Sequence, residues 1–108
     1  MAEQASEREA LLRREYHGQT ARINWHELQT QFAGGNVVLV DAETDLVEVA
    51  VQLGLDNTAQ FEQWISEGSV APVSDEQAGH WYEANQELWA VVAAPWVLVQ
   101  IHVANHGR

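Results

Sequence analysis

The chain has 108 residues, 46% of them hydrophobic, which suits one globular domain spanning residues 1–108. It lacks cysteine, which excludes a disulfide framework and cysteine-held metals. Between positions 23 and 107 it has twelve acidic residues and no Lys or Arg, a charge that repels nucleic acid. The N-terminus has no apolar signal-peptide core and the longest apolar run, residues 88–99, is too short to span a bilayer, so we expect a cytoplasmic protein that enters no membrane.

The first element is a charged N-terminal helix within residues 1–17. Residues 5–16 place Leu11, Leu12 and Tyr16 in one narrow apolar stripe among Glu and Arg residues. Gly18 is a typical helix stop, so the segment 17–22 is expected to be a loop.

A second helix and a strand follow. Asn24 is a good N-cap with Glu27 at the capping-box position, and the pair Gly34-Gly35 ends the helix. The β-branched run VVLV, bounded by a polar residue on each side, predicts a short buried strand over residues 37–41.

Three further helices are predicted from N-cap signals. In each, a side-chain acceptor precedes a Glu or Gln by three residues, which is the capping-box spacing. The pairs are Asp45 with Glu48, Asn57 with Gln60, and Ser74 with Gln77. Gly68 ends the middle helix, and residues 69–73 are expected to be extended because Pro72 biases its predecessor away from helix.

The apolar run near the C-terminus predicts two strands, residues 88–93 and 96–103, which meet at Ala94-Pro95. Proline cannot donate to a sheet ladder, so it belongs at the bend. Beyond it the side chains alternate: Val97, Val99, Ile101 and Val103 face one way, and Leu98, Gln100 and His102 face the other. Residues 104–108 are expected to be a frayed tail.

Together these elements predict an α+β fold with a small, mainly antiparallel sheet. Its three strands are 37–41, 88–93 and 96–103, packed by four or five helices. The order of elements also resembles a winged helix, with residues 45–67 as the helix-turn-helix. The would-be recognition helix has no basic residue, so such a fold would make protein contacts instead of DNA contacts.

Four stretches resemble, in this order and spacing, the bacterial family known as domain of unknown function 2288. They are GQTARINWHEL (18–28), LVDAETDLVEVA (39–50), DNTAQFEQWISEG (56–68) and LWAVVAAPWVLVQ (88–100). The resemblance covers the chain from about Leu11 to Gln100. It implies membership of an uncharacterised family, and it brings no catalytic or ligand-binding residue with it.

The acidic residues Asp41, Glu43 and Asp45 cluster where a strand turns into a helix. Oxygen ligands clustered in this way could bind a divalent cation or do acid–base work. The competing interpretation is structural, because Asp45 caps a helix and its neighbours face water. The structural interpretation is favoured.

The five tryptophans are the most unusual feature of the composition. Trp25, Trp64 and Trp81 each lie on the apolar stripe of a predicted helix, so the core should contain them. Trp89 and Trp96 would share the sheet face opposite Val97, Val99 and Ile101 if the two last strands pair. That face is either covered by helices or exposed to a partner.

The sequence thus favours a non-enzymatic protein-binding or regulatory module, with Trp89 and Trp96 as candidate contacts and a basic partner favoured by the acidic body. The alternative is a small enzyme or divalent-cation-binding protein that uses Asp41, Glu43 and Asp45. A DNA-binding winged helix ranks third. No motif indicates a cofactor, and the oligomeric state is left open.

Overall fold

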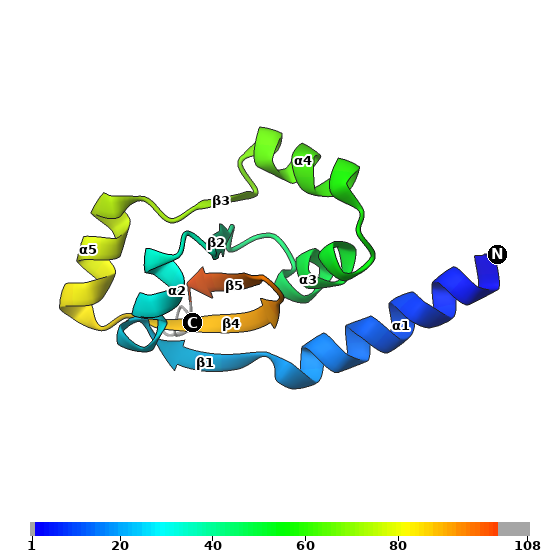
Figure 1. Ribbon diagram of the computed structural model, residues 1–108, viewed down its shortest axis with the longest axis horizontal. Coiled ribbons are helices and arrows are strands. Elements are labelled where there is room, and N and C mark those ends of the chain that lie inside the picture. Colours follow the sequence, from blue (N-terminus) through cyan, green and yellow to red (C-terminus); the bar gives the residue numbers. More distant parts are fainter. Residues whose placement is uncertain (1, 102–108) are drawn as a thin grey trace, which may run out of the picture.

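The computed structural model describes residues 2–101, with side chains from Glu7 onward. A five-stranded sheet has the order β1-β4-β5-β2-β3, with helices beside it and α1 projecting from one end (Figure 1). The strands are β1 Ala21–Asn24, β2 Val37–Val40, β3 Val70–Pro72, β4 Glu87–Ala93 and β5 Trp96–Ile101. The helices are α1 Ala2–Gln19, the 3-10 helix η1 Trp25–Leu28, α2 Gln29–Ala33, α3 Leu46–Gly54, α4 Thr58–Glu67 and α5 Asp75–Ala84.

The α+β class is confirmed, but the expected three-stranded, mainly antiparallel sheet is wrong. The sheet has five strands and is mixed, because β2 pairs with β5 in parallel while the other pairs are antiparallel. The two additional strands are the edges, β1 and β3. β1 has a single large apolar residue and β3 contains a proline, so neither shows the alternation that identifies a strand from sequence. The winged-helix-like order does not describe this larger sheet.

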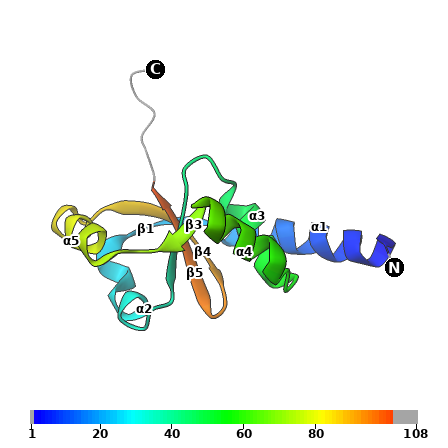
Figure 2. The same cartoon turned by 90° about the horizontal axis from the view of Figure 1, so that it is seen from above.

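The predicted hairpin is confirmed, with β4 and β5 antiparallel from Leu88–Ile101 to Ala93–Trp96. The end of the expected strand at residues 102–103 and the expected frayed tail at 104–108 lie outside the described residues. Both faces of the sheet are covered, and Figure 2 shows α5 and α2 on one side of the central strands with α3 and α4 on the other.

The α3 face of the sheet packs against α3 and α4. The cluster between this face and the helices, the α3-face cluster, buries Val38, Val40, Val70, Val91, Ala93 and Leu98 from the sheet and Leu46, Val49 and Ala50 from α3. Trp64 packs at the margin of this cluster, half-buried. Burial of apolar side chains on this face supplies the main stabilisation of α3 and α4.

The Trp25 face packs against η1, α2 and α5. Trp25 is fully buried and meets Phe32 and Trp81 edge-on, with ring centroids 5.3 and 5.0 Å apart. Such T-shaped contacts add to the area that the rings bury. The expectation that Trp25 and Trp81 belong to the core is confirmed.

The three helix starts predicted from cap signals are confirmed. The Asp45 carboxylate accepts hydrogen bonds from the N–H groups of Val47 and Glu48, at 3.0 and 3.3 Å. The side chains of Asn57 and Ser74 each accept from the N–H three residues later. Gly68 ends α4 in the left-handed region, at φ 83°.

The two helices expected in the N-terminal third are confirmed, as α1 and as η1 with α2. The expected loop over residues 17–22 and the expected side-chain cap by Asn24 are wrong. α1 does not stop at Gly18, because the N–H and hydroxyl of Thr20 both bond to the carbonyl of Tyr16 and carry the helical turn past the glycine. Asn24 does not cap a helix through its side chain. It is the last residue of β1, and its Nδ2 donates to the carbonyl of Asn85. Pairing with β4 therefore replaced the predicted loop and cap.

α1 packs against α3 through side chains between Arg8 and Tyr16. Gly54 is the point of close approach, because a Cβ there would lie 3.1 Å from the Tyr16 hydroxyl and 3.3 Å from a Leu12 methyl. Arg8 donates to the Gly54 carbonyl, and Arg13 forms an ion pair with Glu48 at 2.6 Å. The hydrogen bond to Glu48 raises the pKa of the Arg13 guanidinium.

The helices of the described part, residues 2–101, include no stretch that is both long and apolar enough to cross a membrane.

Candidate functional site

Trp89 and Trp96 lie on the same face of the sheet. In the β4–β5 register, Trp89 is opposite Gln100 and Trp96 is opposite Ala93, and both indoles pack at the margin of the α3-face cluster. Val97 and Val99 belong to the other cluster. The predicted arrangement of the two tryptophans is confirmed, and both are half-buried. Each lines a separate hollow.

The Trp89 hollow, with a volume of about 430 Å³, lies where the end of α1 meets the start of α3. Its walls combine an indole, a carboxylate, two hydroxyls, an imidazole and a primary amide. The lining residues are His17, Thr20, Thr44, Asp45, Leu46, Val47, Trp89 and Gln100. This mixture of one aromatic surface with several polar groups is typical of sites that orient a polar or charged ligand.

Gln100 fixes one wall of the Trp89 hollow. Its Nε2 donates to the carbonyl oxygens of Asp41 and Thr44, at 2.8 and 2.6 Å. These two bonds tie the acidic loop, residues 41–45, to the neighbouring β5 strand. The loop is thus held in one shape without a bound ligand, which lowers the entropy that binding would otherwise lose. Sequence reasoning placed Gln100 on the right face but did not find this role, because it depends on residues 56 and 59 positions away.

The indole of Trp89 also contacts a cationic side chain of the same protein, that of Arg22. Arg22, directly opposite it on β1, places its guanidinium carbon 5.8 Å from the centroid of the indole. This distance is within the range of cation–π attraction. Arg22 also lies 4.0 Å from the Glu87 carboxylate and has a half-exposed side chain. The indole of Trp89 is thus chemically suited to cations, and sequence reasoning missed this because Arg22 was expected in a loop.

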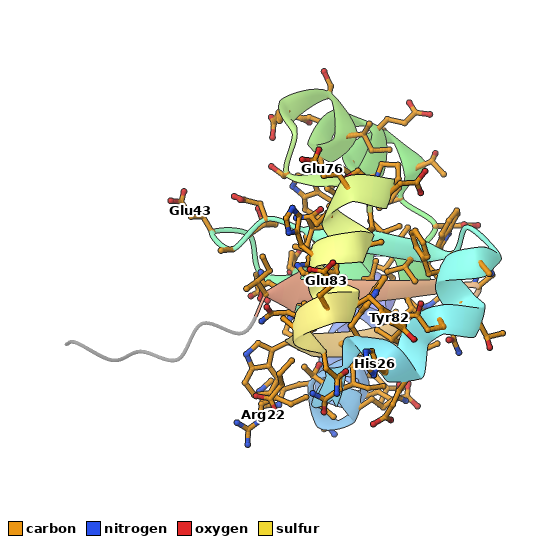
Figure 3. All side chains as sticks on the ribbon, turned by 90° about the vertical axis from the view of Figure 1, so that its left-hand side faces the viewer. Arg22, His26, Glu43, Glu76, Tyr82 and Glu83 are labelled. Atoms are coloured by element: carbon orange, nitrogen blue, oxygen red, sulfur yellow. The ribbon has the colours of Figure 1, made fainter. Side chains whose placement is uncertain are left out.

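The three acidic candidates are not gathered at one point. Asp45 lines the Trp89 hollow while its carboxylate caps α3. Glu43 lies at the tip of the acidic loop and points away from the body (Figure 3). The Asp41 carboxylate accepts a long bond, 3.4 Å, from the N–H of Glu43.

Over residues 2–101 no group of three or more His, Asp or Glu side chains is arranged to hold a metal ion. Cation binding by Asp41, Glu43 and Asp45 stays a prediction.

The Trp96 hollow is smaller, about 230 Å³, and almost wholly apolar. It lies beside β3 and α4. The lining residues are Gly35, Val37, Val38, Phe61, Ile65, Val70, Ala71, Pro72 and Trp96. Ile65 is half-exposed at this site. The hollow has no charged side chain to orient a ligand, so it offers apolar contact area only.

A polar cluster joins η1 to the end of α5. The Nε2 atom of His26 lies 2.7 Å from the Tyr82 carbonyl oxygen, and the centroids of the two rings are 4.4 Å apart (Figure 3). The backbone N–H of His26 donates to the Asn85 side chain. Asn85 adopts a left-handed conformation at φ 47° and so turns the chain from α5 towards β4. These contacts hold the end of α5 against η1, so the role of these three residues is structural.

Comparisons with known proteins place this geometry in context. The model of the family described as "Protein of unknown function (DUF2288)" matches residues 11–101. The chain is also similar to a solved structure, the "NMR solution structure of PA1075 from Pseudomonas Aeruginosa". The two sequences are 41% identical over 86% of each chain, and the structures superpose with a TM-score of 0.75. No curated protein matches the chain. Neither description names a substrate, ligand or partner.

Proposed function

Because the chain belongs to the DUF2288 family, whose description assigns no activity, we propose a function from the Trp89 hollow itself: the protein is a non-enzymatic cytoplasmic binding module that docks a basic segment of a protein partner. An arginine or lysine side chain of that segment enters the hollow between the indole of Trp89 and the carboxylate of Asp45. The observation that carries the proposal is that Trp89 already holds a guanidinium, that of Arg22, over its ring.

The acidic charge of residues 23–107 favours a basic partner. From position 23 to 107 the chain has twelve acidic residues and no Lys or Arg. Such a surface attracts a cationic segment over the Debye length and speeds its association. The hollow then adds short-range selectivity, because a cation between an indole and a carboxylate gains from both groups.

The test is an NMR titration of ¹⁵N-labelled protein with a short arginine-containing peptide. The matched control peptide carries citrulline, which has the same shape as arginine but no charge. We expect the arginine peptide to shift the indole N–H resonance of Trp89 and to lose affinity as salt is raised. We expect the citrulline peptide to leave that resonance unchanged.

Two variants locate the binding. Trp89→Leu should weaken binding about three-fold or more, as loss of a cation–π contact at an exposed site predicts. Asp45→Asn keeps a good N-cap and removes only the charge. Glu62→Gln on α4 makes the same change of net charge away from the hollow and is the control. Equal weakening by Asp45→Asn and Glu62→Gln would show that binding depends on the general charge, and would overturn the assignment of the hollow.

A further inference from the structure

β1 is an open edge of the sheet. It is first in the strand order, and no other strand of residues 2–101 pairs with its outer side. Figure 1 shows β1 along the lower margin of the sheet with no helix below it. The opposite edge differs, because β3 contains Pro72, a residue that blocks strand addition. The sequence of β1, ARIN, has no proline.

The hydrogen-bond pattern identifies which groups of β1 point outward. The Trp25 N–H donates to the Gln86 carbonyl at 2.8 Å, directly after the Asn24–Glu87 pair in the register. In an antiparallel ladder, alternate residues bond to the neighbouring strand. Ile23 therefore bonds inward to β4, whereas Arg22 and Asn24 direct their N–H and C=O groups away from the sheet.

We propose that β1 is a self-association edge, on which β1 of a second copy of this chain pairs antiparallel about a two-fold axis at Ile23. In this register the N–H and C=O of Arg22 bond to those of Asn24 in the other copy. The two-fold axis repeats this pair with the copies exchanged. The two outward-facing residues of each copy therefore form four hydrogen bonds in all. The two five-stranded sheets become one continuous sheet, and each Ile23 faces its counterpart at a non-hydrogen-bonded position.

The charge distribution favours a second copy at this edge. β1 has one charged residue, Arg22, which is basic. The first 22 residues are electrically balanced, with four arginines and four glutamates, whereas residues 23–107 have twelve acidic residues and no Lys or Arg. Two copies of the chain therefore repel each other least when they approach through β1. The two-fold axis then places the acidic parts of the two copies on opposite sides of the joined strands. Because four residues per copy form a contact well below the area of a stable interface, the dimer dissociates at low concentration.

A pair of substitutions at Asn24 tests the pairing. Asn24 has φ −87° and ψ 146°, a conformation close to that of proline. Asn24→Pro and Asn24→Ala both remove the side-chain bond to Asn85, but only the proline removes the outward N–H. By sedimentation equilibrium we expect the unmodified protein and Asn24→Ala to dimerise reversibly, and Asn24→Pro to associate about ten-fold more weakly or not at all.

The position of the axis is tested by disulfide trapping, since the chain has no cysteine of its own. Residues facing each other at a non-hydrogen-bonded position lie about 4.5 Å apart at Cα, which a disulfide can bridge. We expect Ile23→Cys to form a linked dimer rapidly in a glutathione buffer. Val92→Cys and Leu11→Cys are the controls, because both positions are more than half-exposed and lie off the edge.

Three results would overturn the proposal. They are a monomeric protein up to about millimolar concentration, an unchanged dimer in a folded Asn24→Pro variant, and disulfide trapping of Leu11→Cys or Val92→Cys as fast as that of Ile23→Cys. The ¹H–¹⁵N spectrum of each variant shows whether it is folded. The outcome does not depend on whether the Trp89 hollow binds a basic peptide.

Discussion

The carboxylate of Asp45 accepts hydrogen bonds from Val47 and Glu48 and also lines the Trp89 hollow. One side chain therefore stabilises the start of α3 and sets the charge of the candidate site. The cap holds the carboxylate in place, so a ligand that binds it meets a group whose position is already fixed. Glu43, two residues earlier, points into solvent and lines no wall of this hollow.

Substitutions at Asp45 should separate these two roles. Asp45→Ala is expected to lower the free energy of unfolding by about 1 kcal/mol, because the N–H groups at the start of α3 lose their acceptor. Asp45→Asn should change stability little, since asparagine caps as well as aspartate does. Urea denaturation measures both. Glu43→Ala is the control and should be neutral; destabilisation by Glu43→Ala as large as that by Asp45→Ala would contradict the cap.

At the scale of elements, α1 has no fully buried side chain among its described residues, 7–19. It has a charged sequence and projects from the body (Figure 1), and its Leu11 side chain is 58% exposed. Isolated helices of this length are marginal in water, so the contact with α3 stabilises it. That contact is centred on Gly54, where a Cβ would already lie 3.1 Å from Tyr16 and 3.3 Å from Leu12, so a large side chain has no room.

Gly54→Leu is expected to displace α1 from its place on α3. Overpacking of this kind costs about 1–3 kcal/mol. Amide exchange in residues 8–19 should therefore become about ten-fold faster or more, while exchange in β4 and β5 stays slow. Hydrogen exchange followed by NMR measures this. Gly79→Leu on α5 is the matched control, because no atom lies within 4 Å of its Cβ position. Equal acceleration by both substitutions would contradict the proposed contact.

At the scale of the whole molecule, acidic charge is the dominant electrostatic feature. The net charge is −11 and the molecule measures 48 × 32 × 25 Å. At low ionic strength the Debye length is about 30 Å, comparable to these dimensions, so the acidic groups repel one another across the fold. Few ion pairs offset this repulsion in the described residues, and the shortest joins Arg13 to Glu48.

Added salt is therefore expected to stabilise the fold. Raising NaCl from about 20 mM to about 500 mM should raise the melting temperature by about 3 °C or more, because screening weakens the repulsion. Calorimetry measures the shift. The double variant Glu62→Gln, Glu67→Gln carries two fewer charges and should respond less. A melting temperature that falls with salt would mean that attractive ion pairs outweigh the repulsion.

Most features whose signals are local in the sequence are predicted correctly, and the stop at Gly18 and the side-chain cap by Asn24 are the exceptions. A cap such as Asp45 or Ser74 acts on N–H groups two or three residues away, so its effect is readable from the sequence. The alternation beyond Pro95 likewise gave the β4–β5 hairpin and put Trp89 and Trp96 on one face. The family was identified from stretches of the same kind, and its model matches the chain over residues 11–101.

The tertiary structure decided everything that depends on distant partners. β1 exists because β4 pairs with it from more than 60 positions away, and this pairing overrode the helix cap that Asn24 offered locally. The parallel pairing of β2 with β5 has no local signature either. The Trp89 hollow is formed in the same way, from α1, the acidic loop, β4 and β5 together. The sequence by itself determined the capped helices, the hairpin and the acidic surface, whereas the sheet edges and the candidate site arose only when long-range pairing brought those segments together.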